Sequence, residues 1–169
     1  MKFRSLYKAR TENLGVTMKP AELKKVLNGD PERFHFHWVT DSSFIISLNF
    51  SFGSNLVWDV NRPNTNSEIL FYGKLSEIEN SKTKIELKTR SKTFLATLLV
   101  VLPLLVVFLQ IIFRFEWPIF LLLFAFFPLA ILGLLHFIRS EEDGLLRLFQ
   151  EYLNDEIMKH EKNVAEKLL

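Results

Sequence analysis

The fold is decided by two apolar segments, TFLATLLVVLPLLVVFLQIIF at Thr93–Phe113 and PIFLLLFAFFPLAILGLLHFI at Pro118–Ile138. Each segment has 21 residues and contains no Asp, Glu, Lys or Arg. The hydrocarbon core of a bilayer is about 30 Å thick and takes about 20 apolar helical residues to cross. Because only four residues separate the two segments, they predict a two-helix transmembrane hairpin.

Positive charge is concentrated on one side of this hairpin. The residues that precede the first segment include Lys82, Lys84, Lys88, Arg90 and Lys92. Arg139 follows the second segment, whereas the tip offers Arg114 beside Glu116. Since Lys and Arg favour the cytoplasmic ends of membrane helices, both termini are predicted to be cytoplasmic. The predicted membrane-interface residues are Lys88, Arg90, Lys92, Trp117 and Arg139, and we expect the cations to contact anionic lipid.

Charge and composition divide the 169-residue chain into three parts. The net charge of +2 is the sum of +5 for residues 1–92, +1 for residues 93–139 and −4 for residues 140–169. We expect a cytoplasmic head at 1–92, a hairpin at 93–139 with spans 93–113 and 118–138, and a tail at 140–169. The basic residues lie near the membrane segments, which argues against a nucleic-acid partner. The chain has no cysteine, which excludes disulfides and thiolate chemistry.

The head has the pattern of a small α+β domain. Residues 2–8 (KFRSLYK) are consistent with a first strand. Residues 19–28 (KPAELKKVLN) predict a short helix, with Thr17 as its N-cap, Pro20 in its first turn and Gly29 after its end.

Apolar residues then alternate with polar ones, which predicts an antiparallel sheet. Residues 33–39 and 44–52 carry apolar side chains, many of them aromatic, at every second position, and Thr40–Ser43 is expected to form the turn between them. The remaining predicted segments are strands at 56–60, 68–78 and 83–89 and a polar loop at 61–67. The expected fold is an antiparallel β-meander or roll with one short helix, followed by the hairpin and a C-terminal amphipathic helix.

The last predicted strand runs within a few residues into the first membrane segment. In this strand Ile85 and Leu87 are expected to face the core, while Lys84, Glu86 and Lys88 face water. Because the connection leaves no room for a flexible linker, we expect the head to be held at the inner membrane surface.

One set of features resembles a known group of proteins. It comprises FYGKL at Phe71–Leu75, the pattern T-x-I-x-L at Thr83–Leu87, the hairpin and the charged tail helix. Together these resemble small, uncharacterised bacterial inner-membrane proteins that have a β-rich cytoplasmic head. The resemblance covers residues 68–160. It implies a bacterial inner (cytoplasmic) membrane location and carries no activity.

The tail predicts one amphipathic helix that begins at Ser140 as its N-cap, with acidic residues in its first turn. Its apolar stripe follows helical spacing. The stripe residues expected to face a partner are Leu146, Phe149, Leu153, Ile157, Val164 and Leu168. The polar face is acidic at its start, which does not fit a surface-lying membrane helix. Three partners remain open: the chain's own head, a second copy of the chain, or another protein.

No residue pattern indicates catalysis or a bound cofactor. His35 and His37 share one face of a strand and are the only metal-ligand candidates, but a zinc site needs more ligands than the two of them. The glycines are isolated, so neither a P-loop nor a dinucleotide-binding pattern is present. We therefore expect no catalytic, cofactor-binding or established metal site.

These observations favour a non-enzymatic protein. The first hypothesis is a membrane-anchored interaction module, either a scaffold or an accessory subunit, with a protein partner or a homo-oligomeric state. The alternative is a head that senses a lipid or a small ligand in an aromatic-lined cavity. A membrane enzyme with a site formed by residues such as His136, Arg139 and His35 is less favoured. A channel is less favoured still, because two nearly non-polar spans line a pore poorly.

Overall fold

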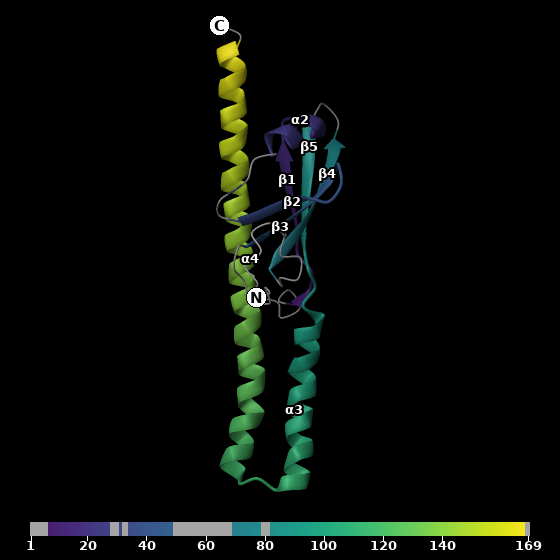
Figure 1. The fold of residues 1–169 in the computed structure, drawn as a ribbon. Coiled ribbons are helices and arrows are strands. Elements are labelled where there is room, and N and C mark those ends of the chain that lie inside the picture. Colours follow the sequence, from purple (N-terminus) through teal and green to yellow (C-terminus); the bar gives the residue numbers. More distant parts are fainter. Residues whose placement is uncertain (1–6, 28–30, 32–33, 49–68, 79–81, 168–169) are drawn as a thin grey trace. The chain divides into compact units, whose positions relative to one another are not determined.

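The computed structural model describes residues 7–27, 31, 34–48, 69–78 and 82–167. Its chain divides into two compact units. One unit comprises residues 91–140 and the N-terminal residues up to 9; the other comprises residues 10–90 and 141–169. The elements in chain order are β1 (Thr11–Val16), α2 (Pro20–Val26), β2 (Phe34–Trp38), β3 (Ser43–Leu48), β4 (Leu70–Ile78), β5 (Lys82–Thr89), α3 (Thr93–Phe113) and α4 (Trp117–Lys167) (Figure 1).

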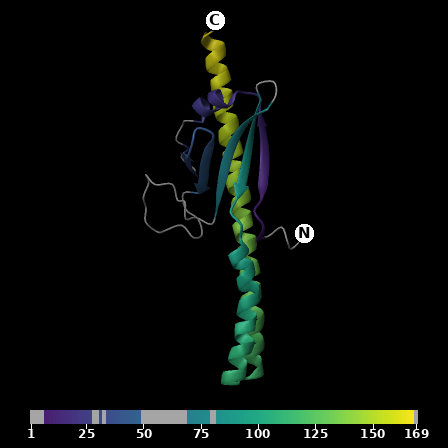
Figure 2. The same ribbon diagram turned by 90° about the vertical axis from the view of Figure 1, so that its right-hand side faces the viewer.

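The second unit is built on a five-stranded antiparallel sheet with the order β1-β5-β4-β3-β2 (Figure 2). Strands β2, β3 and β4 each pair with the next strand along the chain, and β1 pairs with β5. The sequence prediction of an antiparallel α+β fold is confirmed. Within the described residues, β1 and β2 are the two edges of the sheet.

One face of the sheet is the core face. In β5, Ile85 and Leu87 have no exposed surface while Lys88 is exposed, as the alternation predicts. The registers place Phe44 opposite Gly73 and Leu75 opposite Ile85, so these side chains share one face. The buried residues on this face include Phe34, Phe44, Ile46, Phe71, Leu75, Ile85 and Leu87.

Helix α2 is shorter than predicted. It begins at Pro20, and its N-cap is Lys19, which makes no side-chain capping hydrogen bond. The prediction of Thr17 as N-cap was therefore wrong, because proline with its fixed φ sets the first helical position two residues further on. Leu23 and Val26 are buried, and α2 contacts β4 and β5.

The first strand is also displaced from its predicted position. Tyr7 and Lys8 are not in a strand, and β1 runs from Thr11 to Val16 instead. Every second residue of β1, at Thr11, Asn13 and Gly15, is exposed, so its apolar pattern is weak. The remaining part of the predicted first strand, at residues 2–6, lies outside the described residues. So do residues 49–52, the strand at 56–60, the loop at 61–67, the turn residues 79–81 and Gly29.

The first unit contains α3 and the beginning of α4, which are separated by residues 114–116. The backbone at Arg114 is left-handed, with φ of 49° and ψ of 50°, and its N–H donates to the carbonyl of Gln110. The side chain of Gln110 donates to the carbonyl of Phe115. These two hydrogen bonds close the end of α3 at the point where the chain leaves the helix.

Helix α4 is continuous over 51 residues. No helix begins at Ser140, so the prediction of an N-cap there was wrong. A capping side chain acts on backbone N–H groups that lack a partner inside the helix, and the helix preceding Ser140 already supplies those partners. The acidic residues after Ser140 therefore lie in the interior of a helix.

Both α3 and α4 are long and apolar enough to cross a membrane. Only 6% of the most apolar window of α3 and 11% of that of α4 is buried. The core helix of a soluble domain would be mostly buried. Helix α3 continues through Pro103 near its middle, and α4 continues through Pro128, which lies near the middle of the predicted span 118–138.

Candidate interaction surface

The C-terminal part of α4 packs on the core face of the sheet. Phe149 has no exposed surface, and its ring centre lies 6.3 Å from that of Phe34 and 5.7 Å from that of Phe44. The ring of Tyr152 lies edge-on to Phe34 at 5.5 Å. Among the three partners left open by the sequence, the chain's own head is therefore the one that Phe149 contacts.

The remaining stripe residues divide according to their position along α4. Leu146 and Leu153 are buried, and Ile157 is half-buried. The side chains of Val164 and Leu168 lie outside the described part of the chain. The buried residues thus lie in the first half of the stripe, and exposure increases toward the C-terminus.

An aromatic cluster forms the centre of this packing. Phe44 stacks on Phe36 with a centroid separation of 5.0 Å and meets Trp38 edge-on at 5.3 Å. The other side of the Phe44 ring lies against Gly73 of β4: a Cβ atom on Gly73 would be 2.2 Å from Cζ of the ring. The ring therefore lies directly over the backbone of Gly73, which only a glycine permits.

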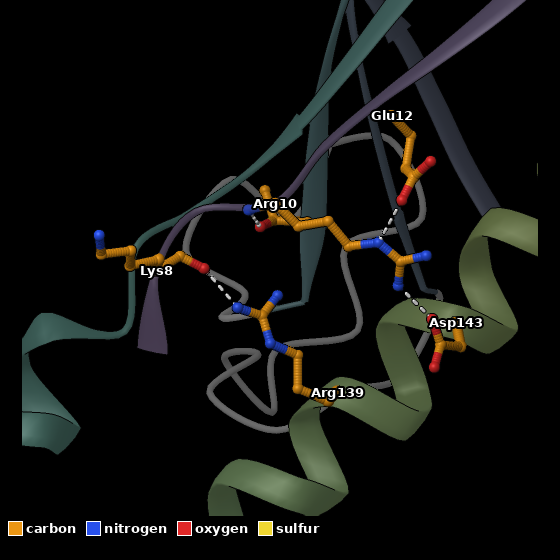
Figure 3. A network of polar contacts seen from close by, with 6 residues as sticks. Lys8, Arg10, Glu12, Arg139 and Asp143 are labelled. Carbon is orange, nitrogen blue, oxygen red and sulfur yellow. Dashed lines mark hydrogen bonds and ion pairs between the residues drawn. The ribbon is translucent and has the colours of Figure 1, made fainter. Parts of the chain in front are cut away.

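A polar clamp formed by Arg10, Glu12 and Asp143 holds α4 to β1 (Figure 3). The guanidinium of Arg10 donates through Nε to Glu12 at 2.6 Å and through a terminal nitrogen to Asp143 of α4. The backbone N–H of Arg10 donates to the Thr89 hydroxyl, and the N–H of Thr89 donates to the Arg10 carbonyl. Arg10 therefore joins β1, β5 and α4.

The charge of Arg10 does not change over the pH range in which proteins fold. Partial burial lowers the pKa of Arg10, but hydrogen bonds to Asp143 and Glu12 and the attraction of both carboxylates outweigh burial and raise the pKa above its ordinary value. In the other unit, Arg139 of α4 makes a comparable contact, donating to the carbonyl of Lys8 (Figure 3).

Replacing Arg10 with Gln is expected to loosen α4 from the sheet without unfolding the head. The substitution removes two partly exposed ion pairs, each worth about 0.2–1 kcal/mol. Hydrogen exchange of backbone amides in residues 141–153 should become faster, while exchange in β4 stays unchanged. Lys24→Gln is the matched control, because Lys24 pairs at 2.6 Å with the exposed Asp41, an ion pair that includes no α4 residue. Equal acceleration in both variants would contradict the clamp.

The predicted membrane-interface residues are not equivalent in the structure. Lys88, Arg90 and Trp117 are exposed. Lys92 and Arg139 are buried, with 2% and 9% of their surfaces exposed. A buried cation is held by contacts within its own chain, so Lys88 and Arg90 are the two cations of the predicted set that remain available to a lipid surface.

His35 and His37 lie on the face of β2 opposite the aromatic cluster. His37 is exposed and His35 is half-buried. Within the described residues, no group of three or more His, Cys, Asp or Glu side chains is placed to hold a metal ion. The pair does not gain further ligands from the part of the fold that the structure describes.

A groove of about 430 Å³ lies between β1, with the two residues after it, and α4, all within the second unit. One wall is the segment from Asn13 to Met18, and the other is one face of α4. The α4 residues that line the groove are Gln150, Leu153, Asn154, Ile157 and Glu161. Within the described residues, the side chains of Gln150, Asn154 and Glu161 make no hydrogen bond or ion pair.

Sequence reasoning identified Leu153 and Ile157 but not this groove. Gln150, Asn154, Ile157 and Glu161 follow one another at spacings of four, three and four residues, so they form one face of the helix. This face borders the apolar stripe. Its amide side chains did not indicate a binding site in the sequence, because amides are common on solvated helix surfaces.

No protein-family model, curated protein or solved structure matches this chain.

Proposed function

We propose that this chain is a two-pass membrane protein whose cytoplasmic β-rich head serves as a non-enzymatic interaction module, either as a scaffold or as an accessory subunit. The single observation that carries the proposal is the composition of α4. The first part of this helix is apolar and largely exposed, while Phe149, further along the same helix, is part of the core of the sheet. One continuous helix thus contributes apolar exposed residues to the first unit and a core residue to the second.

The membrane part of the proposal is supported by the exposed apolar residues of α3 and α4. Phe94, Ile111 and Leu129 expose 67% to 72% of their surfaces. Exposed apolar surface on this scale indicates a membrane or a protein interface. The short connection at residues 114–116 supports a hairpin, and the basic residues before α3 support cytoplasmic termini.

The interaction part is supported by the groove at β1, where α4 presents three polar side chains that have no partner within the described residues. No triad or convergent acid–base pair occurs in this groove among the described residues. Enzymatic activity is therefore not part of the proposal. Contact of Lys88 and Arg90 with anionic lipid is a secondary element of it.

The alternative function, a head that senses a lipid or small ligand, requires space on the aromatic face. Phe149 and Tyr152 cover part of that face and contact Phe34 directly. This packing favours the interaction module over the sensor. The bacterial inner membrane remains a prediction that rests on the resemblance of residues 68–160.

Native mass spectrometry of the full chain, extracted from its own membrane with a mild detergent, tests the proposed function. We expect a complex of defined stoichiometry that contains a second protein. A monomer that carries one lipid or small molecule in fixed ratio would overturn the proposal in favour of the sensing head. A bare monomer would contradict both.

A further inference from the structure

Among the described strands, β1 is an edge strand, so one side of its backbone has no strand partner there. In an antiparallel pair, residues that exchange backbone hydrogen bonds alternate with residues that do not. The N–H of Thr89 donates to the carbonyl of Arg10 at 2.9 Å. The even-numbered residues of β1 therefore direct their backbone N–H and C=O groups toward β5. Asn13 and Gly15 are odd-numbered, so their N–H and C=O groups point away from β5. Both residues line the groove.

The glycine at position 15 is not required by the fold of this chain. A Cβ atom built on Gly15 meets nothing within 4 Å, and its φ is not in the left-handed region. Gly73 differs, because Phe44 occupies the space of its Cβ. A glycine inside a strand weakens the strand and often marks a place where another backbone approaches closely. Gly15 leaves the outward backbone of β1 accessible at the groove.

The opposite wall has groups suited to a peptide. Gln150 and Asn154 carry amides, each of which has both a donor and an acceptor for a peptide backbone. Leu14, Leu153 and Ile157 provide apolar surface between the walls. Glu161 is exposed and has no partner within the described residues, so it places one negative charge at the groove.

We propose that the groove between β1 and α4 binds an extended peptide segment of a partner protein, which adds to the sheet as a sixth strand beside β1 and places a Lys or Arg opposite Glu161. Strand addition of this kind takes its affinity from main-chain hydrogen bonds and its specificity from side-chain pockets. The proposal rests on the proposed interaction function and identifies its binding site. A second copy of the chain fits less well, because it would bring its own Glu161 to the same edge.

The test uses the full chain in lipid nanodiscs and a display library of random eight-residue peptides. We expect enrichment of peptides that alternate apolar residues and carry Lys or Arg at one fixed position. Gly15→Pro removes an outward N–H without removing a bond to β5, so affinity for the enriched peptides should fall at least about tenfold. Glu161→Lys should shift the enriched residue from basic to acidic.

Thr11→Pro is the matched control. The backbone groups of Thr11 also point away from β5, but Thr11 does not line the groove. Its affinity for the peptides should stay within about twofold of the original protein. Thermal melting of all variants establishes that they fold, and Glu161→Lys, a surface change, tests the site even if a proline variant fails to fold.

Either of two results would overturn the inference: no enriched motif with the original protein, or binding unaffected by both Gly15→Pro and Glu161→Lys. These results leave the proposed function standing if native mass spectrometry still finds a partner complex. Conversely, loss of that complex with Gly15→Pro and not with Thr11→Pro would locate the partner at this edge.

Discussion

Substitution of Gly73 by Ala should destabilise the head by more than about 3 kcal/mol, the upper end of the usual range for overpacking. The new methyl carbon would lie 2.2 to 2.7 Å from three ring atoms of Phe44. The ring has little freedom to move, because it is 1% exposed and has Phe36, Trp38 and Phe149 as ring neighbours. Such a loss is a large share of the 5–15 kcal/mol that stabilises a typical domain. Near-ultraviolet circular dichroism during thermal unfolding in detergent measures it.

Gly15→Ala is the control for this prediction. Gly15 lies in a strand of the same sheet, but its Cβ position is open, so the change should be neutral or slightly stabilising. Adding Phe44→Leu to Gly73→Ala should restore part of the lost stability, because the shorter side chain vacates the space above residue 73. If Gly73→Ala and Gly15→Ala have the same melting temperature, the close contact between Phe44 and residue 73 does not exist in the protein.

Substitution of Phe149 by Ala should release α4 from the sheet. Removal of a buried phenylalanine costs about 3–5 kcal/mol through lost apolar burial and the cavity left behind. Phe149 is fully buried and contacts rings from both β2 and β3. Backbone amides of residues 141–160 should therefore exchange with solvent much faster, and those of β3 should also lose protection.

Met158→Ala is the matched variant on the same helix, since Met158 is 59% exposed. It should leave the exchange of residues 141–153 unchanged. If Phe149→Ala and Met158→Ala behave alike, the tail helix does not depend on its contact with the sheet. In that case the apolar stripe would instead contact a second copy of the chain or another protein, the two other partners that the sequence leaves open.

Elements with strong periodicity were predictable from the sequence. Strands β2, β3, β4 and β5 follow from alternation of apolar and polar residues, and α3 follows from 21 apolar residues without charge. The position of β1 was not predictable, because its outward residues Thr11, Asn13 and Gly15 are polar or lack a side chain. This strand is specified by its pairing with β5 rather than by its own pattern.

The helix ends were the second failure, and the reason is similar. Ser140 and the acids after it form a good local start signal, but the preceding residues are already helical, so the signal has no free N–H groups to cap. The partner of the tail stripe was also undetermined, since an apolar stripe is the same whichever surface covers it. Only the position of Phe149 against Phe34 and Phe44 resolves it.

The candidate site was the least predictable part. The groove combines an edge strand with a helix more than 130 residues away in the sequence. Its polar residues can be recognised as the lining of a groove only when β1 is known to lie beside α4. A sequence pattern within one element does not reveal such a site.

The central claim is that the chain crosses a membrane twice and presents its sheet and its tail on the cytoplasmic side. Because the chain has no cysteine, single substitutions Lys74→Cys, Glu116→Cys and Lys159→Cys report their location without interference; all three positions are exposed. In intact cells, a membrane-impermeant maleimide should label residue 116 alone, and labelling of residues 74 and 159 should require permeabilisation. Labelling of all three positions, or of none, in intact cells would contradict the account.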